Sequence, residues 1–292
     1  MELIDKKTIG KKLNGRLLLN KVLKYIFLLC TLVGLVVLAT LLIDTIIDGW
    51  SYLTTDFFTN FSSSRPENAG IRGALIGTLW LMATTAPIAI ILSVGTALYL
   101  EEYAPKNKLT DFIKINISNL AGVPSVVFGL LGLTLFVRMA GLGNSVLAAA
   151  LTMSLMILPV IVVASQEAIR SVPSSIREAS IGMGATKWQT ITRIILPASL
   201  PGIITGIILA LSRAIGETAP LVVIGIPTIL LFTPTGVFDT FSALPMQIFS
   251  WVKMPNPEFQ SITAAAILVL LFILFLMNSV AIYIRNKYSK RF

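Results

Sequence analysis

The chain alternates long apolar runs with shorter polar segments that hold most of its charged residues. Six of these runs are long enough to cross a bilayer as helices, because about 20 residues at roughly 1.5 Å each match a hydrocarbon core about 30 Å thick. They are Tyr25 to Ile43, Ala74 to Leu100, Ile117 to Val137, Ser145 to Ala168, Pro201 to Ile226 and Ile262 to Ile284. The pattern therefore predicts an all-α polytopic membrane protein with six transmembrane helices.

The basic residues are divided unevenly between the two sides of these predicted helices. If both termini are cytoplasmic, 18 of the 23 Lys and Arg residues lie on the inner side, four lie outside, and Arg213 lies within the fifth run. Cytoplasmic loops of membrane proteins carry such an excess of Lys and Arg. We therefore predict cytoplasmic termini and a lipid bilayer as the surrounding medium. Because the cations do not form one water-exposed face, no nucleic-acid partner is expected.

Composition argues against chemistry within this chain. It contains no histidine and a single cysteine, Cys30, which lies in the first apolar run. The commonest general base and metal ligand is therefore missing, and neither an intrachain disulfide nor a thiolate metal cluster can form. We expect no catalytic residues, no metal site and no cofactor, and an intramembrane enzyme is the least favoured class of function.

Two predicted external segments, Asp44 to Gly73 and Pro227 to Ser261, are rich in aromatic residues. Such side chains form a belt at the membrane surface or contact an external partner, and the belt is the commoner role. The residues concerned are Trp50, Tyr52, Phe57, Phe58, Phe61, Phe241, Phe249 and Trp251.

The predicted cytoplasmic segment between the fourth and fifth runs has the pattern of two short helices. Ser175 with Glu178, and Thr186 with Gln189, each have the spacing of a capping box, which satisfies free amides at a helix start. Gly184 lies between the two helices, where a left-handed turn suits glycine. Pro197 is expected to end the second helix, and Pro201 lies near the start of the fifth span.

This segment resembles the cytoplasmic signature of ABC importer permeases, which is Glu-Ala-Ala, three residues, Gly, nine residues, then Ile-x-Leu-Pro. Only Ser180 departs from it, by replacing one small residue with another. The resemblance implies the type I ABC importer permease fold and a coupling helix that docks on a separate ATPase subunit. In agreement, the chain has no Gly-x-x-x-x-Gly-Lys-Ser/Thr motif for binding ATP itself. The residues assigned to ATPase coupling are Glu178, Ala179, Ser180, Gly184, Ile194, Leu196 and Pro197.

Two strong charges lie within the fifth apolar run. Arg213 is about 18 Å along a helix from Pro201 at roughly 1.5 Å per residue, and Glu217 follows one turn later. Charged residues at this depth usually pair, face a cavity and mark a pathway. Two roles stay open: a pair that fixes helix packing, or a substrate path in which the planar guanidinium of Arg213 attracts an oxyanion.

The stretch from Ser212 to Pro220, Ser-Arg-Ala-Ile-Gly-Glu-Thr-Ala-Pro, resembles the fifth-span motif of phosphate importer permeases, and its ending is similar to the A-type subunit. Leu120 to Leu130 resembles the same family. The resemblance implies a bacterial or archaeal inner membrane, a sister permease in a heterodimer, two ATP-binding subunits and an external phosphate-binding protein. The alternatives are an importer of molybdate, sulfate or phosphonate, and an ion-coupled secondary carrier.

These interpretations divide the chain into four parts. Residues 1–22 are a basic cytoplasmic segment, and residues 23–70 hold the first transmembrane helix and an external loop. Residues 71–284 are the permease core, with the coupling loop at 169–200. Residues 285–292 are a cytoplasmic tail.

Overall fold

The computed structural model describes the backbone of residues 6–288 and the side chains of residues 16–287. The basic side chains before Arg16 and the last four residues of the predicted tail lie outside this part. Within it the chain is all-α, and no β-strand is formed. Its longest helices are α1 (Lys6–Gly49), α3 (Arg72–Leu98), α6 (Val146–Arg170), α9 (Leu196–Gly216) and α12 (Glu258–Tyr288).

Shorter elements connect and extend the long helices. Three of them are π-helical turns, η3 (Tyr99–Tyr103), η4 (Leu133–Met139) and η5 (Ile191–Ile195), and two are 3₁₀ turns, η1 (Trp50–Tyr52) and η2 (Pro66–Asn68). The α-helical ones are α2 (Thr55–Thr59), α4 (Lys108–Leu120), α5 (Ser125–Gly132), α7 (Ser174–Gly182), α8 (Lys187–Thr190), α10 (Ala219–Ile224) and α11 (Leu244–Trp251).

Five helical segments of the described chain are long and apolar enough to cross a membrane, and a bent pair would make a sixth. The prediction of a single helix over Ile117 to Val137 is therefore wrong. The segments Lys108–Leu120 and Ser125–Met139 meet at an angle of 104°. Pro124 explains the bend, because proline has no amide hydrogen to donate and disfavours helical backbone at the residue before it.

The fifth predicted span, Pro201 to Ile226, also differs from the structure. Pro197 does not end the second short helix, since Lys187–Gly216 runs as one helical segment. The π-turn η5 ends two residues before Pro197, and its changed hydrogen-bond register accommodates the proline ring. At the other end, helix α9 stops at Gly216, and the chain restarts as α10 with Pro220 in its first turn.

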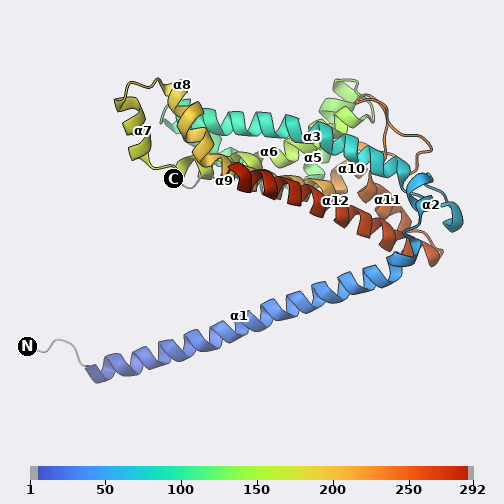
Figure 1. Cartoon of the computed structure of the whole chain (residues 1–292), viewed down its shortest axis with the longest axis horizontal. Coiled ribbons are helices and arrows are strands. Elements are labelled where there is room, and N and C mark those ends of the chain that lie inside the picture. The colour runs from blue at the N-terminus through green and yellow to red at the C-terminus, as the bar shows by residue number, and fades with distance from the viewer. Residues whose placement is uncertain (1–5, 289–292) are drawn as a thin grey trace, which may run out of the picture.

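Helices α3, α6 and α9 form the centre of the bundle, with α12 packed along α9 (Figure 1). Glycines permit the close approach: a Cβ on Gly77 in α3 would collide with the backbone carbonyl of Ser242, and one on Gly206 in α9 with the side chain of Ala164 in α6. Hydroxyls add bonds between helices. The Ser154 Oγ donates to the Thr85 carbonyl at 3.2 Å, and the Ser93 Oγ donates to the Leu158 carbonyl at 3.3 Å.

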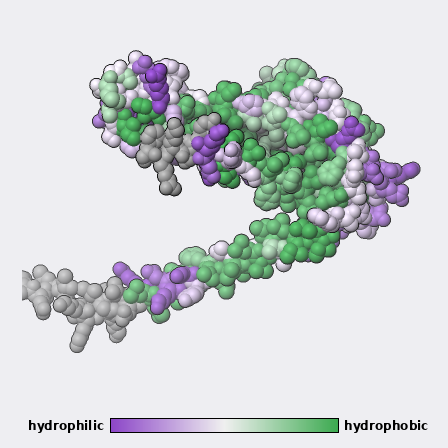
Figure 2. Space-filling view, viewed as in Figure 1, coloured by the Kyte–Doolittle hydropathy of each residue, from purple (hydrophilic) through white to green (hydrophobic). Residues whose placement is uncertain are grey.

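Helix α1 leaves the bundle at an angle and meets it at its C-terminal end (Figure 1). There, a Cβ on Gly49 would lie 2.6 Å from the backbone nitrogen of Ala265 in α12. The membrane-crossing part of α1 is not buried by the rest of the chain. Its middle is apolar and its N-terminal end is hydrophilic (Figure 2), which suits a helix surrounded by lipid or by another protein.

The aromatic segments at the end of the bundle opposite α7 and α8 are in part a packed core. Phe57, Trp251 and Phe259 are buried, and the Trp251 ring lies 6.4 Å from that of Phe57 and 6.2 Å from that of Phe259. Phe241 is also buried. The expectation that these residues form a surface belt is therefore wrong for Phe57, Phe241 and Trp251, although Trp50 is exposed.

A loop covers the start of α6 at the same end of the molecule. The Asp239 carboxylate accepts hydrogen bonds from the Thr235 hydroxyl at 2.7 Å and from the amides of Thr235 and Gly236 at 2.8 and 2.9 Å. These bonds hold the pKa of Asp239 below its usual value. The Asp239 carbonyl in turn accepts from the Val146 amide at 3.0 Å, so the loop caps α6.

The contact at Gly77 leads to a test of the packing. We expect Gly77→Ala to lower stability by about 1 to 3 kcal/mol, the usual cost of overpacking. Gly95→Ala in the same helix is the matched control, because a Cβ there would meet nothing within 4 Å. Thermal unfolding of the purified chain in detergent compares the two variants. Equal melting temperatures would contradict the close packing at Gly77.

Candidate functional site

The predicted coupling segment is a hairpin of two short helices, α7 and α8. Gly184 has a φ of +88°, the left-handed conformation expected of it. The predicted capping box at the start of α8 is confirmed: the Thr186 amide donates to the Gln189 Oε1 at 2.8 Å, and the Gln189 amide donates to the Thr186 Oγ1 at 3.3 Å. Both features fix the direction in which the chain leaves the turn.

The predicted capping box of Ser175 with Glu178 is wrong. Pro173 occupies the N-cap position of α7, and no side chain caps this helix. The helix begins at Ser174, so Ser175 lies inside its first turn, where its hydroxyl is not placed to cap the free amides.

The residues of the coupling motif divide into an exposed set and a packed set. Glu178, Ala179 and Gly184 are exposed on the hairpin. Ser180 is buried, and its hydroxyl lies 2.9 Å from the Thr190 hydroxyl, which joins the two short helices. The remaining motif residues, Ile194, Leu196 and Pro197, lie on the helical segment that leads into the bundle. Ile194 and Leu196 are half-buried there, with Leu196 packed against a buried apolar cluster, and Pro197 is exposed.

Three large apolar side chains are exposed around the Gly184 turn: Ile181 is 58% exposed, Met183 81% and Trp188 66%. The hairpin lies at one end of the molecule, in a region with strongly hydrophilic residues (Figure 2). An apolar patch beside polar residues is typical of a surface that binds another protein. The sequence motif contains none of these three residues.

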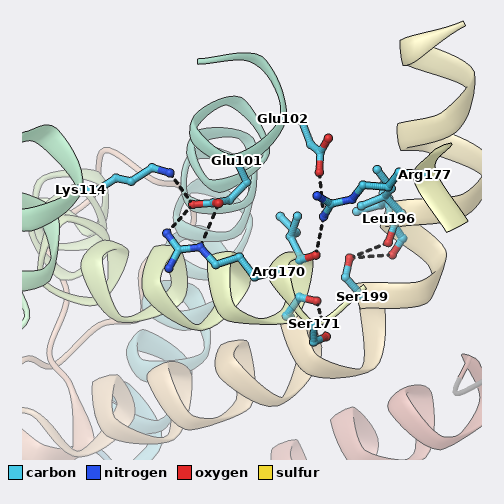
Figure 3. Close-up of polar contacts among 11 residues, drawn as sticks. Glu101, Glu102, Lys114, Arg170, Ser171, Arg177, Leu196 and Ser199 are labelled. Carbon is cyan, nitrogen blue, oxygen red and sulfur yellow. Dashed lines mark hydrogen bonds and ion pairs between the residues drawn. The ribbon is translucent and has the colours of Figure 1, made fainter. Parts of the chain in front are cut away.

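Charged residues missed by the sequence analysis surround the base of the hairpin. Glu101 and Glu102 lie in the π-turn η3, which continues α3 toward the hairpin (Figure 3). They pair with Arg170 at the end of α6 and with Arg177 in α7, respectively. The sequence signal that was available is the pair of adjacent acids at the end of the second predicted span. Arginines follow at the end of the fourth span and in the segment after it.

The structure brings Arg213 and Glu217 together. The Arg213 Nε donates to the Glu217 Oε1 at 3.4 Å, although α9 ends at Gly216 and Glu217 has extended backbone. The Arg213 side chain is 51% exposed, and that of Glu217 is 20% exposed. The next residue back, Ser212, is bonded to Asn278 of α12 at 2.6 Å. The pair therefore lies on the surface of this chain, on a side of α9 that the chain itself leaves open.

The open side of α9 is otherwise made of apolar and small residues. Leu209, Arg213 and Gly216 are exposed along it, at spacings of four and three residues that place them on one face. An arginine facing lipid near mid-membrane costs about 2.5 to 3.5 kcal/mol on insertion scales. This face is therefore suited to contact with protein or water rather than with lipid tails.

The arrangement of helices matches that of known ABC importer permeases. A chain of a bacterial alginate ABC transporter, solved with an alginate pentasaccharide-bound periplasmic protein, aligns with a TM-score of 0.67 at 19% identity, over 93% of this chain and 96% of that one. A chain of the MetNI methionine ABC transporter aligns with a TM-score of 0.62 at 16% identity, over 75% and 96%. The protein therefore has the type I ABC importer permease fold, as its sequence predicts.

Residues 89–290 match the profile of the binding-protein-dependent transport system inner membrane component family, and the chain belongs to that family. Sequence relatives include the probable ABC transporter permease protein YqgI of Bacillus subtilis, 38% identical over 80% of each chain. The phosphate transport system permease protein PstA 1 of Mycobacterium tuberculosis is 35% identical over 93% of this chain and 90% of its own length.

The positive φ of Gly184 predicts that the hairpin tolerates no β-branched residue there. Gly184→Val should destabilise the turn by about 1 to 2 kcal/mol or more, since a left-handed conformation is strained for such a side chain. We expect amides of α7 and α8 to exchange with deuterium roughly 5 to 30 times faster than in the wild type. Hydrogen exchange of peptides from residues 174–190 measures this.

The control is Gly182→Ala, because Gly182 lies at the end of α7 with open space around its Cβ position. Unchanged exchange in Gly184→Val would show that the turn does not depend on glycine.

Proposed function

We propose that this chain is a permease subunit of an ATP-driven importer of inorganic phosphate. It forms the translocation path together with a sister permease, and it does not hydrolyse ATP itself. The relatives from Mycobacterium tuberculosis and Mycobacterium leprae support the substrate, since both are named as phosphate transport system permease proteins. The family and the fold support transport as the class of function.

The observation that carries the proposal is the half-exposed Arg213 on the open side of α9. A face with this charge is compatible with the membrane interior only if protein or water covers it. A sister permease facing α9 across a hydrated path meets that requirement. The guanidinium of Arg213 attracts the phosphate oxyanion, and Glu217 competes for the guanidinium so that the anion is released.

The hairpin supports a second part of the proposal, which is ATPase coupling in the cytoplasm. We infer that Ile181, Met183 and Trp188, together with Glu178 and Ala179, dock on one of two ATP-binding subunits. The membrane is then the inner membrane of a bacterial or archaeal cell, with both termini inside. An external phosphate-binding protein delivers substrate at the opposite end, where α2, α11 and the aromatic core lie (Figure 1).

Two alternatives have different consequences. An importer of molybdate, sulfate or phosphonate uses the same machinery, but phosphate would then not compete with its substrate. An ion-coupled secondary carrier needs no ATPase, so that vesicles containing this chain alone would transport phosphate along an ion gradient. The exposed hairpin favours the importer, because a carrier working alone has no use for an apolar docking patch on a polar hairpin.

The orientation of the chain can be tested with single cysteines after Cys30 is replaced by serine. Ser64 and Ser174 are both exposed. Ser64 follows α2 and Ser174 begins α7, and these two helices lie at opposite ends of the bundle (Figure 1). We expect Ser64→Cys to react with an impermeant thiol reagent added to intact cells, and Ser174→Cys to react only after permeabilisation. The reverse labelling pattern would overturn the orientation and the coupling role of the hairpin.

The path is tested by phosphate uptake into vesicles that contain this chain, the sister permease and the ATP-binding subunits, with the external phosphate-binding protein added outside. Wild-type uptake should require ATP and both partners. Arg213→Gln should reduce uptake at least tenfold, and Arg213→Lys should restore part of it, because a point ammonium cannot reproduce the guanidinium fork. Glu217→Gln should also reduce uptake, because the anion is then held too long.

Assembly should stay normal in these variants, since an exposed pair contributes only about 0 to 1 kcal/mol to stability. Arg138→Gln is the matched control, because Arg138 is an exposed arginine outside α9. If the double variant Arg213→Gln, Glu217→Gln transports normally, the pair lines no path. Uptake by wild-type vesicles without ATPase would instead favour the secondary carrier.

A further inference from the structure

The π-turn η3 at the end of α3 contacts three elements that lead into or form the hairpin. It contains Glu101, Glu102 and Tyr103, which we call the η3 anchor. The two carboxylates are among the least exposed charged groups of the ion pairs in the described chain, at 10% for Glu101 and 9% for Glu102.

Glu101 joins α3 to the end of α6. Arg170 donates to it through two nitrogens, with Nε to Oε2 at 3.0 Å and NH2 to Oε1 at 2.8 Å, in the bidentate geometry that fixes both groups in direction (Figure 3). The Nζ of Lys114 in α4 lies 2.9 Å from the same carboxylate. Glu101 therefore connects three helices just before the chain enters the hairpin.

Glu102 and Tyr103 contact the hairpin itself. The NH2 nitrogen of Arg177 in α7 lies 3.1 Å from the Glu102 Oε1. The same nitrogen donates to the Ile169 carbonyl in α6 at 2.8 Å. The Nζ of Lys187, the first residue of α8, lies 4.9 Å from the centre of the Tyr103 ring, within the range of a cation–π contact. Each short helix of the hairpin is thus attached to η3 by one cation.

We propose that the η3 anchor positions the coupling hairpin against α3, so that displacement of the hairpin by the ATPase moves α3 and α6 together. This inference rests on the proposed function, because it assigns positioning residues to the coupling step. The interlocked packing of α3 with α6 carries such a displacement into the bundle. A π-turn suits the role, since such turns are concentrated at functional positions in helices.

A purely stabilising role explains the arrangement less well. The Arg177 side chain keeps 28% of its surface exposed while Glu102 keeps 9%, so the pair is only partly buried. The neighbouring residues Glu101 and Glu102 pair with arginines on different elements. These are Arg170 at the end of α6 and Arg177 in α7. This division fixes the angle of the hairpin to the bundle, which a coupling device requires.

The test compares Glu102→Gln with Glu167→Gln in the assembled complex. Glu167 is the matched control, because it pairs with Arg170 at 3.2 Å from within the same helix and so joins no separate elements. We expect Glu102→Gln to lower phosphate transported per ATP hydrolysed at least fivefold while hydrolysis continues, and Glu167→Gln to leave this ratio unchanged. The charge exchange Glu102→Arg, Arg177→Glu should recover part of the ratio.

Hydrogen exchange of the purified chain gives a readout independent of transport. Exchange of α7 amides should rise in Glu102→Gln and fall back in the charge exchange. An unchanged transport ratio or unchanged exchange in Glu102→Gln would overturn the anchor, as would equal effects of Glu167→Gln. If wild-type complexes show no ATP-driven phosphate uptake but the exchange results hold, the proposed function fails and the attachment of the hairpin to α3 stands.

Discussion

The close contact between α3 and α6 is the constraint on which the rest of the structure depends. In a bilayer, lipid tails are as apolar as leucine side chains, so helices associate through tight packing and hydrogen bonds between them. Small and hydroxyl side chains supply both here. Ser154 and Ser93 bond across the contact, and Gly77 lets α3 approach the loop at Ser242. Helix α9 packs on the other side of α6 in the same way, where a Cβ on Gly202 would lie 2.7 Å from the Ala168 Cβ.

With the centre fixed, the chain breaks its helices where neighbouring segments cover the exposed backbone. The bend before α5 and the break before α10 bring two short helices against each other, where a Cβ on Gly129 would lie 3.0 Å from the Pro220 Cα. Unpaired backbone groups at membrane depth are tolerated only when protein or a water-filled cavity surrounds them. Transporters use such discontinuous helices near their substrate sites. Glu217 lies in one of these breaks, one turn from Arg213.

Hydropathy was sufficient to predict most of the fold, because long apolar runs leave few alternatives in a membrane. It did not predict the bend at Pro124 or the helix break between Gly216 and Pro220, because an apolar run has the same hydropathy whether its helix is straight or broken. The turn at Gly184 and the cap at Thr186 could be predicted because their signals are local in sequence. The wrong cap at Ser175 shows the limit of that approach, as the N-cap lies two residues earlier, at Pro173.

The contacts of the candidate site were predictable only where both partners lie close in sequence. Arg213 and Glu217 are four residues apart, and the pair was visible as a spacing. Glu101 and Arg170 are 69 residues apart, and their pairing depends on how α3 and α6 align. The buried positions of Phe57 and Trp251 were missed for the same reason, because each packs against a segment far away in the chain.

The proposed coupling and the proposed path are joined by one helical segment. Lys187–Gly216 comprises 30 residues and spans about 45 Å at roughly 1.5 Å per residue, from the exposed Trp188 to the charge pair. A helix of this length transmits a tilt at one end to the other, provided that the middle is held. Its middle packs on α6 through Gly202 and Gly206, and α6 is held to α3 at the hairpin end by Arg170 and Glu101. Movement of the hairpin would therefore change the position of Arg213 relative to Glu217, which lies beyond the break and belongs to the segment packed on α5. If the hairpin docks on an ATPase as proposed, the break at Gly216 would let that ATPase alter how strongly the guanidinium is paired, and so how strongly it attracts an anion.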